Sequence, residues 1–194
     1  MNHIVLFVVN SILFGIGLAM DAFSVSCANG LAAPDMPVRK SFKIAGTFAV
    51  FQTAMPLIGW ILVHTIAEKF EAFQKFIPWI ALGLLLYIGG SMLREGLSGH
   101  AGDDAKGEVG NGTLLMQGVA TSIDALSVGF TIADYNFTEA LAESVIIGVV
   151  TFIICLAGIR LGKTLGTRLS GKAEILGGVI LIGIGLEIFI TGVF

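Results

Sequence analysis

The chain places a carboxylate inside an apolar run in the stretch Gly15-Ile-Gly-Leu-Ala-Met-Asp21-Ala-Phe-Ser24-Val-Ser26, which lies within Ile4 to Ala28. An ionised Asp at the centre of a membrane costs roughly 3 kcal/mol on insertion scales, so it normally faces a protein interior or a water-filled path. The chain repeats the motif Asp-Ala-(Phe/Leu)-Ser-Val 103 residues later (124 minus 21), around Asp124. We expect the rest of the chain to bring these two carboxylates together.

The composition is that of a membrane protein. Hydrophobic residues make up 55% of the chain and charged residues 13%, with a mean hydropathy of +0.91, whereas an average soluble domain carries about 25% charged residues. The lipid bilayer is therefore an expected partner. No basic face with interleaved aromatic residues occurs, which excludes a nucleic-acid partner. Cys27 and Cys155 lie in apolar runs without a metal or disulfide spacing, and we interpret both as small packed hydrophobes.

Six segments have the length of about 20 mostly apolar residues that a spanning helix needs. They cover approximately Ile4–Ala28, Phe42–Ile66, Ile77–Leu93, Thr113–Ala133, Ala140–Leu161 and Ile175–Val193. The Gly-rich, charged stretch 95–112 separates them into two groups of three and has the composition of a flexible linker. We therefore predict an all-α integral membrane protein with a three-helix repeat at 1–94, a cytoplasmic linker at 95–112 and a second repeat at 113–194.

Lysine and arginine predict the orientation. Nine of the eleven basic residues lie in the first, third and fifth breaks between the segments. Since cytoplasmic loops carry the excess of Lys and Arg, both termini should be extracytoplasmic. An odd number of helices in each repeat then inserts the second repeat upside down. Inverted repeats with a midplane site are typical of secondary transporters, although channels also contain them.

Polar residues gather on single faces of the predicted helices. In the fourth segment a face at helical period carries Gln117, Thr121, Asp124, Ser127 and Thr131. In the first segment Asp21 shares a face with Ser24. For the hydroxyl groups, ordinary hydrogen bonding within the bundle is an equal alternative.

Pro56 of the second segment withdraws one hydrogen bond from the carbonyl of Gln52. A simple proline kink is the alternative interpretation. A carboxylate, carbonyl and hydroxyl set suits Mg, Ca and Mn, and two negative charges suit a divalent ion. We predict a metal site made of Asp21, Asp124, Gln52, Ser24, Ser127 and Thr121. Glu187 is a further intramembrane acid with no equivalent in the first repeat, and we interpret it as boundary, secondary site or proton carrier.

Four motifs together resemble the MntP-type manganese efflux pumps, small bacterial six-helix transporters related to the lysine-exporter superfamily. The motifs are Met20-Asp-Ala-Phe23, Pro56-Leu-Ile-Gly-Trp60, Thr121-Ser-Ile-Asp-Ala125 and Lys172-Ala-Glu-Ile-Leu-Gly-Gly178. The resemblance covers both halves of the chain. It implies export of Mn²⁺ across the bacterial inner membrane, with Asp21 and Asp124 matching the family's central aspartates.

The sequence thus predicts a transporter, not an enzyme, with Mn²⁺ as substrate and no cofactor. Alternating access is the expected mechanism, with protons as a hypothetical counter-ion because ligating carboxylates must be deprotonated. The alternatives are export of another divalent cation or of a small amino acid, and an intramembrane aspartyl protease, whose Tyr-Asp and Gly-x-Gly-Asp signatures are missing from this sequence. The sequence carries no signal for an oligomeric state.

Overall fold

The computed structural model describes residues 2–74, 77–98, 109–169 and 173–193, and over these ranges the chain is helical, with no strand. The all-α prediction is confirmed for this part of the chain. In order, the helices are α1 (Asn2–Ala32), α2 (Val38–Gln74), α3 (Ile77–Ser98), α4 (Asn111–Ser122), α5 (Ala125–Thr131), α6 (Phe137–Leu169) and α7 (Ala173–Val193).

Most helices are longer than their apolar segments. α2, for example, continues to Gln74, beyond the predicted segment Phe42–Ile66. The predicted segment Thr113–Ala133 is wrong as a single helix, because α4 ends at Ser122 and α5 begins at Ala125. Much of the predicted linker, residues 99–108, lies outside the described part of the chain.

Local sequence signals explain where α6 begins. The Asn136 side chain accepts from the Glu139 backbone N–H at 3.0 Å, and the Glu139 carboxylate accepts from the Asn136 N–H at 3.1 Å. This reciprocal pair is a capping box, which satisfies backbone donors that the first helical turn leaves without partners. The polar break before α6 therefore contains the capping residues that start this helix at Phe137.

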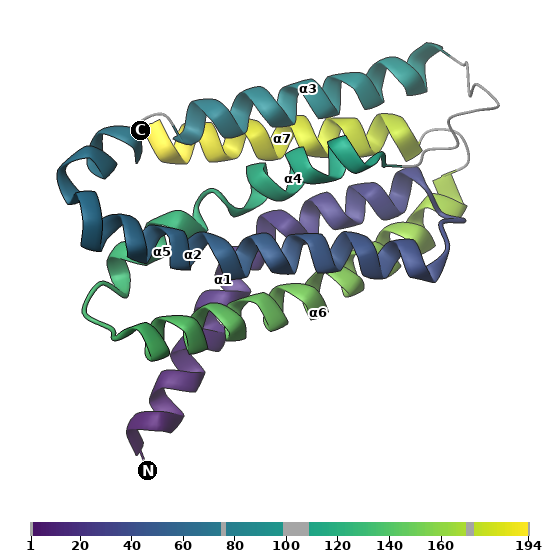
Figure 1. Cartoon of the computed structure of the whole chain (residues 1–194). Helices are drawn as coiled ribbons and strands as arrows, with labels where there is room; N and C mark the ends of the chain where they lie inside the picture. The colour runs from purple at the N-terminus through teal and green to yellow at the C-terminus, as the bar shows by residue number, and fades with distance from the viewer. Residues whose placement is uncertain (1, 75–76, 99–108, 170–172, 194) are drawn as a thin grey trace.

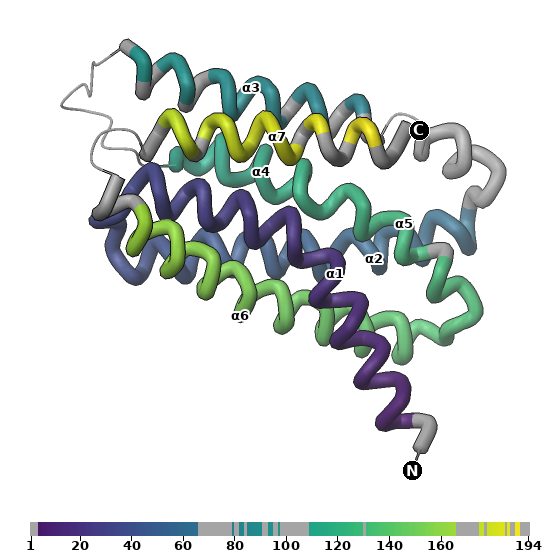
Figure 2. Tube along the Cα trace, turned by 180° about the vertical axis from the view of Figure 1, so that it is seen from behind, coloured from purple at the N-terminus to yellow at the C-terminus, as the bar shows by residue number. Residues whose placement is uncertain are grey.

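The helices pack mainly across the two halves of the chain (Figures 1 and 2). α1 lies along α6, α2 lies along α4 and α5, and α3 lies along α7, while α2 also contacts α6. The N-terminal part of α1 extends away from the other helices. Since each of these pairings joins one helix before residue 99 to one after residue 108, neither half forms a compact unit of its own.

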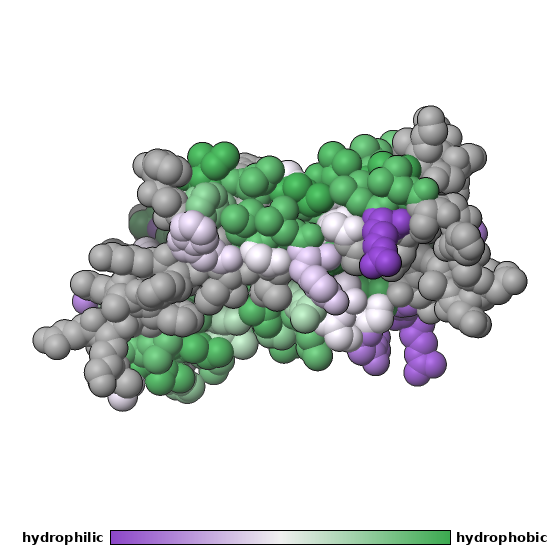
Figure 3. Space-filling view, turned by 90° about the horizontal axis from the view of Figure 1, so that it is seen from above, coloured by the Kyte–Doolittle hydropathy of each residue, from purple (hydrophilic) through white to green (hydrophobic). Residues whose placement is uncertain are grey.

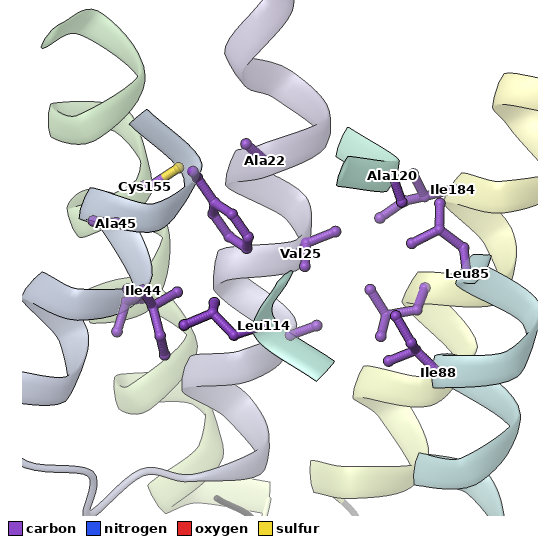
Figure 4. Packing of buried hydrophobic residues seen from close by; sticks show 14 of the residues in the cluster. Ala22, Val25, Ile44, Ala45, Leu85, Ile88, Leu114, Ala120, Cys155 and Ile184 are labelled. Carbon is purple, nitrogen blue, oxygen red and sulfur yellow. The ribbon is translucent and has the colours of Figure 1, made fainter. Parts of the chain in front are cut away.

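Buried apolar side chains join these helices into one core (Figure 4). Val25 of α1, Ile44 of α2, Leu85 of α3, Leu114 of α4 and Cys155 of α6 belong to the same cluster. All five are at most 4% exposed. Cys155 therefore packs as a small hydrophobe, as its apolar run predicted.

Two glycines allow helices to approach backbone to backbone. A Cβ atom on Gly59 of α2 would lie 2.1 Å from the carbonyl oxygen of Leu126 in α5, and a Cβ on Gly158 of α6 would lie 2.8 Å from the carbonyl oxygen of Phe23 in α1. Real Cβ atoms do not come this close, so any larger residue would separate the helices. These contacts fix α5 on α2 and α1 on α6 directly beside the two Asp motifs.

The outer surface is apolar along the length of the bundle. The long apolar side chains Val50, Val149 and Ile153 are 66%, 55% and 61% exposed, and hydrophilic residues gather toward one end in the view of Figure 3. Within the described ranges, three helices are long and apolar enough to cross a membrane: Ile4–Ala32, Val38–Thr65 and Phe137–Leu165. A surface of this kind suits lipid and would aggregate in water.

Candidate cation site

The two repeated aspartates lie on different kinds of backbone. Asp21 is in the continuous helix α1, whereas Asp124 is in the break between α4 and α5. Both side chains are partly buried. Their carboxylates are near enough to repel one another electrostatically. The fold therefore brings together two acidic groups that are 103 residues apart (124 minus 21) in the chain.

Side-chain hydrogen bonds to the backbone lie on both sides of the break before Asp124. The Ser122 hydroxyl donates to the Gly118 carbonyl at 2.6 Å, and the Thr121 hydroxyl donates to the Gln117 carbonyl at 2.9 Å. Such bonds compete for the carbonyls of the helical ladder and bend helices. Beyond the break, the Asp124 carboxylate accepts from the Ala125 N–H at 2.8 Å and so caps α5.

The expected continuous polar face of the fourth segment is consequently wrong. Gln117 and Thr121 are buried within α4, while Ser127 and Thr131 of α5 are exposed. The helical period that placed all of them on one face is lost at the break, because the backbone bonds there span three residues: Leu126 N–H donates to Ile123 at 3.3 Å. Discontinuous helices of this kind free backbone groups near the centre of a transporter.

Gln52 connects the two motifs. Its side chain is completely buried, and its amide nitrogen donates to the carbonyl of Leu18 at 2.8 Å and to that of Thr121 at 3.2 Å. Leu18 and Thr121 each lie three residues before an aspartate. One side chain of α2 thus holds equivalent backbone atoms of α1 and α4, and it fixes the two Asp motifs relative to one another.

The oxygen of the same amide is available. Gln52 Oε1 is buried and has no hydrogen-bond partner among the described residues. A buried polar atom without a partner costs about 1–3 kcal/mol, which a ligand could relieve. Since both amide hydrogens are used by carbonyls, the side-chain oxygen is fixed as an acceptor.

The other predicted ligands lie on these same elements. Ser24 is partly buried in α1. The Thr121 hydroxyl donates within α4, and its carbonyl accepts from Gln52. α2 continues through Pro56, which is buried inside the helix. The Glu187 side chain lies outside the described residues.

The sequence reasoning missed one buried acid. Glu143 of α6 is 1% exposed, and its Oε2 atom has no partner among the residues that the structure describes. Burial and the nearby carboxylates of Glu143 and Glu139 raise the pKa of Tyr135 in the preceding turn. The signal was present, because Glu143 is an acid in the predicted segment Ala140–Leu161.

The reasoning also missed a reciprocal amide pair. Asn29 donates to Gln117 Oε1 at 2.8 Å, and Gln117 donates to Asn29 Oδ1 at 3.0 Å. Asn29 escaped attention because the first predicted segment ended at Ala28, whereas α1 continues to Ala32.

The available donor atoms are oxygens. Over the described part of the chain, no group of three or more His, Cys, Asp and Glu side chains could hold a metal. The oxygen atoms that this part of the chain offers are the carboxylates of Asp21 and Asp124 and the buried, unpartnered side-chain oxygen of Gln52. Hard divalent cations such as Mn²⁺, Mg²⁺ and Ca²⁺ prefer such oxygen ligands over the sites built from thiolates and imidazoles that suit Zn and Cu.

An all-helical fold with an apolar surface and paired acids at its centre defines a small membrane transporter. The model of the family described as "Mntp: Putative manganese efflux pump" matches residues 35–189. The chain belongs to this family, which confirms the resemblance of its motifs, and it is accordingly a transporter and not an enzyme.

Individual relatives are similar over nearly their full length. A "Putative manganese efflux pump MntP 2" of Clostridium botulinum is 42% identical over 193 residues, covering 94% of each chain. Proteins named "Putative manganese efflux pump MntP" from Ruminiclostridium cellulolyticum and Methanosarcina mazei are each 41% identical, covering 94% and 91% of this chain and 95% and 92% of their own. No solved structure matches the chain.

Proposed function

We propose that this protein exports Mn²⁺ from the cytoplasm by alternating access, with Asp21 and Asp124 as the charged ligands. One observation carries the proposal: the Gln52 amide nitrogen donates to the carbonyls of Leu18 and Thr121, each three residues before an aspartate, while the oxygen of the same amide is buried with no hydrogen-bond partner among the described residues. A bound divalent cation would offset the repulsion between the carboxylates of Asp21 and Asp124, and it would give the Gln52 side-chain oxygen a partner. Ser24, Ser127 and Thr121 complete the proposed ligand set.

The packing supports two inverted repeats, 1–94 and 113–194, joined by the linker 95–112. The repeats relate α1 to α4 with α5, α2 to α6, and α3 to α7. The contact of α1 with α6 therefore corresponds to the contact of α4 and α5 with α2, and the contact of α1 with α7 corresponds to the contact of α4 with α3. Contacts of single residues agree: Gly15 packs on Val150 of α6, and Gly118, 103 residues later (118 minus 15), packs on Phe51 of α2. Six spans follow when α4 and α5 cross as one discontinuous helix.

Basic residues support the orientation. Arg39, Lys43, Arg94, Arg160 and Lys163 all lie near the ends of helices that meet the C-terminal end of α1. The Lys163 ammonium donates to the Met36 carbonyl in the turn between α1 and α2, at this same end. Positive charge at one end of a multi-pass protein favours the cytoplasmic side, which places both termini outside the bacterial inner membrane.

Protons are the proposed counter-ion. A carboxylate must lose its proton to bind a metal, so protons and Mn²⁺ compete for Asp21 and Asp124. Arrival of protons from outside would release the cation, and their departure to the cytoplasm would reset the site. Export of another hard divalent cation is the second candidate function, because oxygen ligands also accept Mg²⁺ and Ca²⁺.

The test replaces each aspartate with its uncharged isostere. In inside-out vesicles we expect Asp21→Asn and Asp124→Asn to reduce Mn²⁺ uptake at least about tenfold, since loss of one charge-assisted contact of about 1.5–3 kcal/mol has that effect. Asp35→Asn, in the exposed turn after α1, is the matched control and should export normally. Uptake at the parental rate by either central variant would refute the site, and uptake of Mg²⁺ but not Mn²⁺ by the parent would favour the second function.

A further inference from the structure

Asn29 and Gln117 form a buried polar contact between α1 and α4. Both side chains are completely buried, and two reciprocal hydrogen bonds of 2.8 and 3.0 Å join them. Each amide therefore satisfies one donor and one acceptor of the other. This contact is separate from the Asp pair and is not needed to hold a cation there.

The contact lies on one side of the aspartates. Asn29 follows Asp21 by eight residues of α1, about 12 Å at 1.5 Å per residue, and Gln117 lies in α4, seven residues before Asp124 and on the far side of the break. This is the end where α1 finishes and α4 starts, and it carries the basic residues. The amide pair thus closes the approach to the carboxylates between α1 and α4 from the cytoplasmic side.

The equivalent place in the other half is arranged differently. In the repeat spacing of 103 residues (124 minus 21), Phe14 corresponds to Gln117, and Ile132 corresponds to Asn29. Phe14 is 38% exposed and lines a hollow of about 490 Å³ between α1 and Val128 of α5, together with Asn10, Leu13, Gly17 and Leu18. Hydrogen bonds therefore close α1 onto α4 at the amide pair, while the surface beside Phe14 and Val128 is hollowed and lined mainly by apolar side chains.

The two partners of the amide pair lie on helices that each pack closely on a different neighbour, although α2 and α6 also contact one another. A Cβ on Gly162 of α6 would lie 2.0 Å from the carbonyl oxygen of Cys27, so this part of α1 is fixed on α6. A Cβ on Gly118 would lie 2.5 Å from the Phe51 ring, so α4 is packed closely on α2. A tilt of α1 away from α4 at this end, about the Gln52 bonds that hold both helices near the aspartates, would separate Asn29 from Gln117.

We propose that the Asn29–Gln117 pair is the cytoplasmic gate of the transport path, and that the contact between Phe14 and Ile132 replaces it in the opposite state. The inference rests on the proposed function. Amides suit a gate, because water can take over both hydrogen bonds when the helices part, whereas separating a buried ion pair leaves uncompensated charge. The inverted repeats explain why closing one end opens the other.

The first experiment locks the gate. In a background with Cys27→Ala and Cys155→Ala, the variants Asn29→Cys and Gln117→Cys are combined and bridged with a short bifunctional methanethiosulfonate in inside-out vesicles. We expect bridging to abolish Mn²⁺ uptake and a reductant to restore it. Each single cysteine variant, treated identically, is the matched control, and its own Mn²⁺ uptake should be the same before and after the reagent.

The outcomes separate this inference from the proposed function. Equal Mn²⁺ uptake by the bridged and the reduced double variant would overturn the gate and leave the exporter intact. Absence of uptake in the cysteine-free parent would instead count against the proposed function. In that case the second experiment, which measures labelling and not transport, would test whether the amide pair is a gate.

The second experiment measures the opposite end. In the cysteine-free background, Phe14→Cys is labelled with a membrane-impermeant maleimide in intact cells, with the amide pair present or replaced by Asn29→Ala and Gln117→Ala. Loss of the gate should favour the state in which residues 14 and 132 meet, so labelling should slow several-fold. Labelling of Thr138→Cys, an exposed position at the start of α6, should not change. An unchanged rate at position 14 would overturn the proposal.

Discussion

Gln52 differs from the threonines of α2 in the acceptors of its hydrogen bonds. The hydroxyls of Thr47 and Thr53 donate to carbonyls of their own helix, four residues earlier. Gln52 instead donates to two other helices. Its contribution is therefore to position the Asp motifs, in addition to the oxygen that it offers to a cation.

Replacing Gln52 with leucine tests this role. Leucine keeps most of the volume but leaves the buried carbonyls of Leu18 and Thr121 without this donor. We expect a loss of stability of about 1–3 kcal/mol, which is typical of buried polar groups left unpaired, and at least a tenfold fall in Mn²⁺ transport. Thermal unfolding in detergent and vesicle uptake measure the two effects.

Thr47→Val is the matched control, because it removes a hydroxyl from the same helix away from the site. It should leave both measurements within experimental error of the parent. A Gln52→Leu variant with parental stability and transport would show that the two carbonyls do not need this donor.

At the scale of elements, close helix contacts hold the site. α5 is a short helix of seven residues, too short to be stable alone in water, and it is positioned by its contact with α2. Gly59 makes that contact possible, since its missing side chain leaves room for the carbonyl oxygen of Leu126. The position of Asp124 at the start of α5 therefore depends on a glycine far away in the sequence.

Gly59→Ala should displace α5. The added methyl group would lie 2.1 Å from the Leu126 oxygen, and relief of such overpacking typically costs about 1–3 kcal/mol. We expect a lower unfolding temperature and a large loss of Mn²⁺ transport. Gly46→Ala, in the same helix with no atom within 4 Å of the added carbon, should be neutral or slightly stabilising.

Both variants replace a glycine of α2 with alanine, so the difference between them in unfolding temperature and uptake reports the clash at Gly59 and not the general effect of alanine on helix stability. If Gly59→Ala behaved like Gly46→Ala in both unfolding and uptake, the α2–α5 contact would not be what positions Asp124.

At the scale of the whole molecule, the packing is shared between halves. α1 pairs with α6, α2 with α4 and α5, and α3 with α7. A chain folded in this way forms its centre from both halves, so the first three helices alone should not make a cation site. The charge distribution then decides which end of this bundle faces the cytoplasm.

The membrane topology of the whole chain can be tested with reporters. A reporter fused after Phe194 should be extracytoplasmic, and one inserted within 99–108 should be cytoplasmic, because basic residues concentrate at that end. Pairs of reporters active only outside or only inside the cell measure this directly. A cytoplasmic reporter after Phe194 would reverse the orientation and the direction of transport inferred from it.

The sequence by itself determined the helices, the two Asp motifs and the family. Apolar runs of spanning length are local properties, and a carboxylate inside such a run is visible without any neighbour. The repeated motif around Asp21 and Asp124 therefore predicted where the cation site lies. The family followed from four short motifs, and the family model and the relatives confirm it.

Only the tertiary structure decided how these parts meet. The break between Ser122 and Ala125 is a local change of backbone that the helical period of the sequence does not register. The bonds from Gln52 to Leu18 and Thr121, and the pair Asn29–Gln117, join atoms between 34 and 88 residues apart. Such contacts depend on which helix faces come together, and a periodic pattern specifies a face without specifying the partner that covers it.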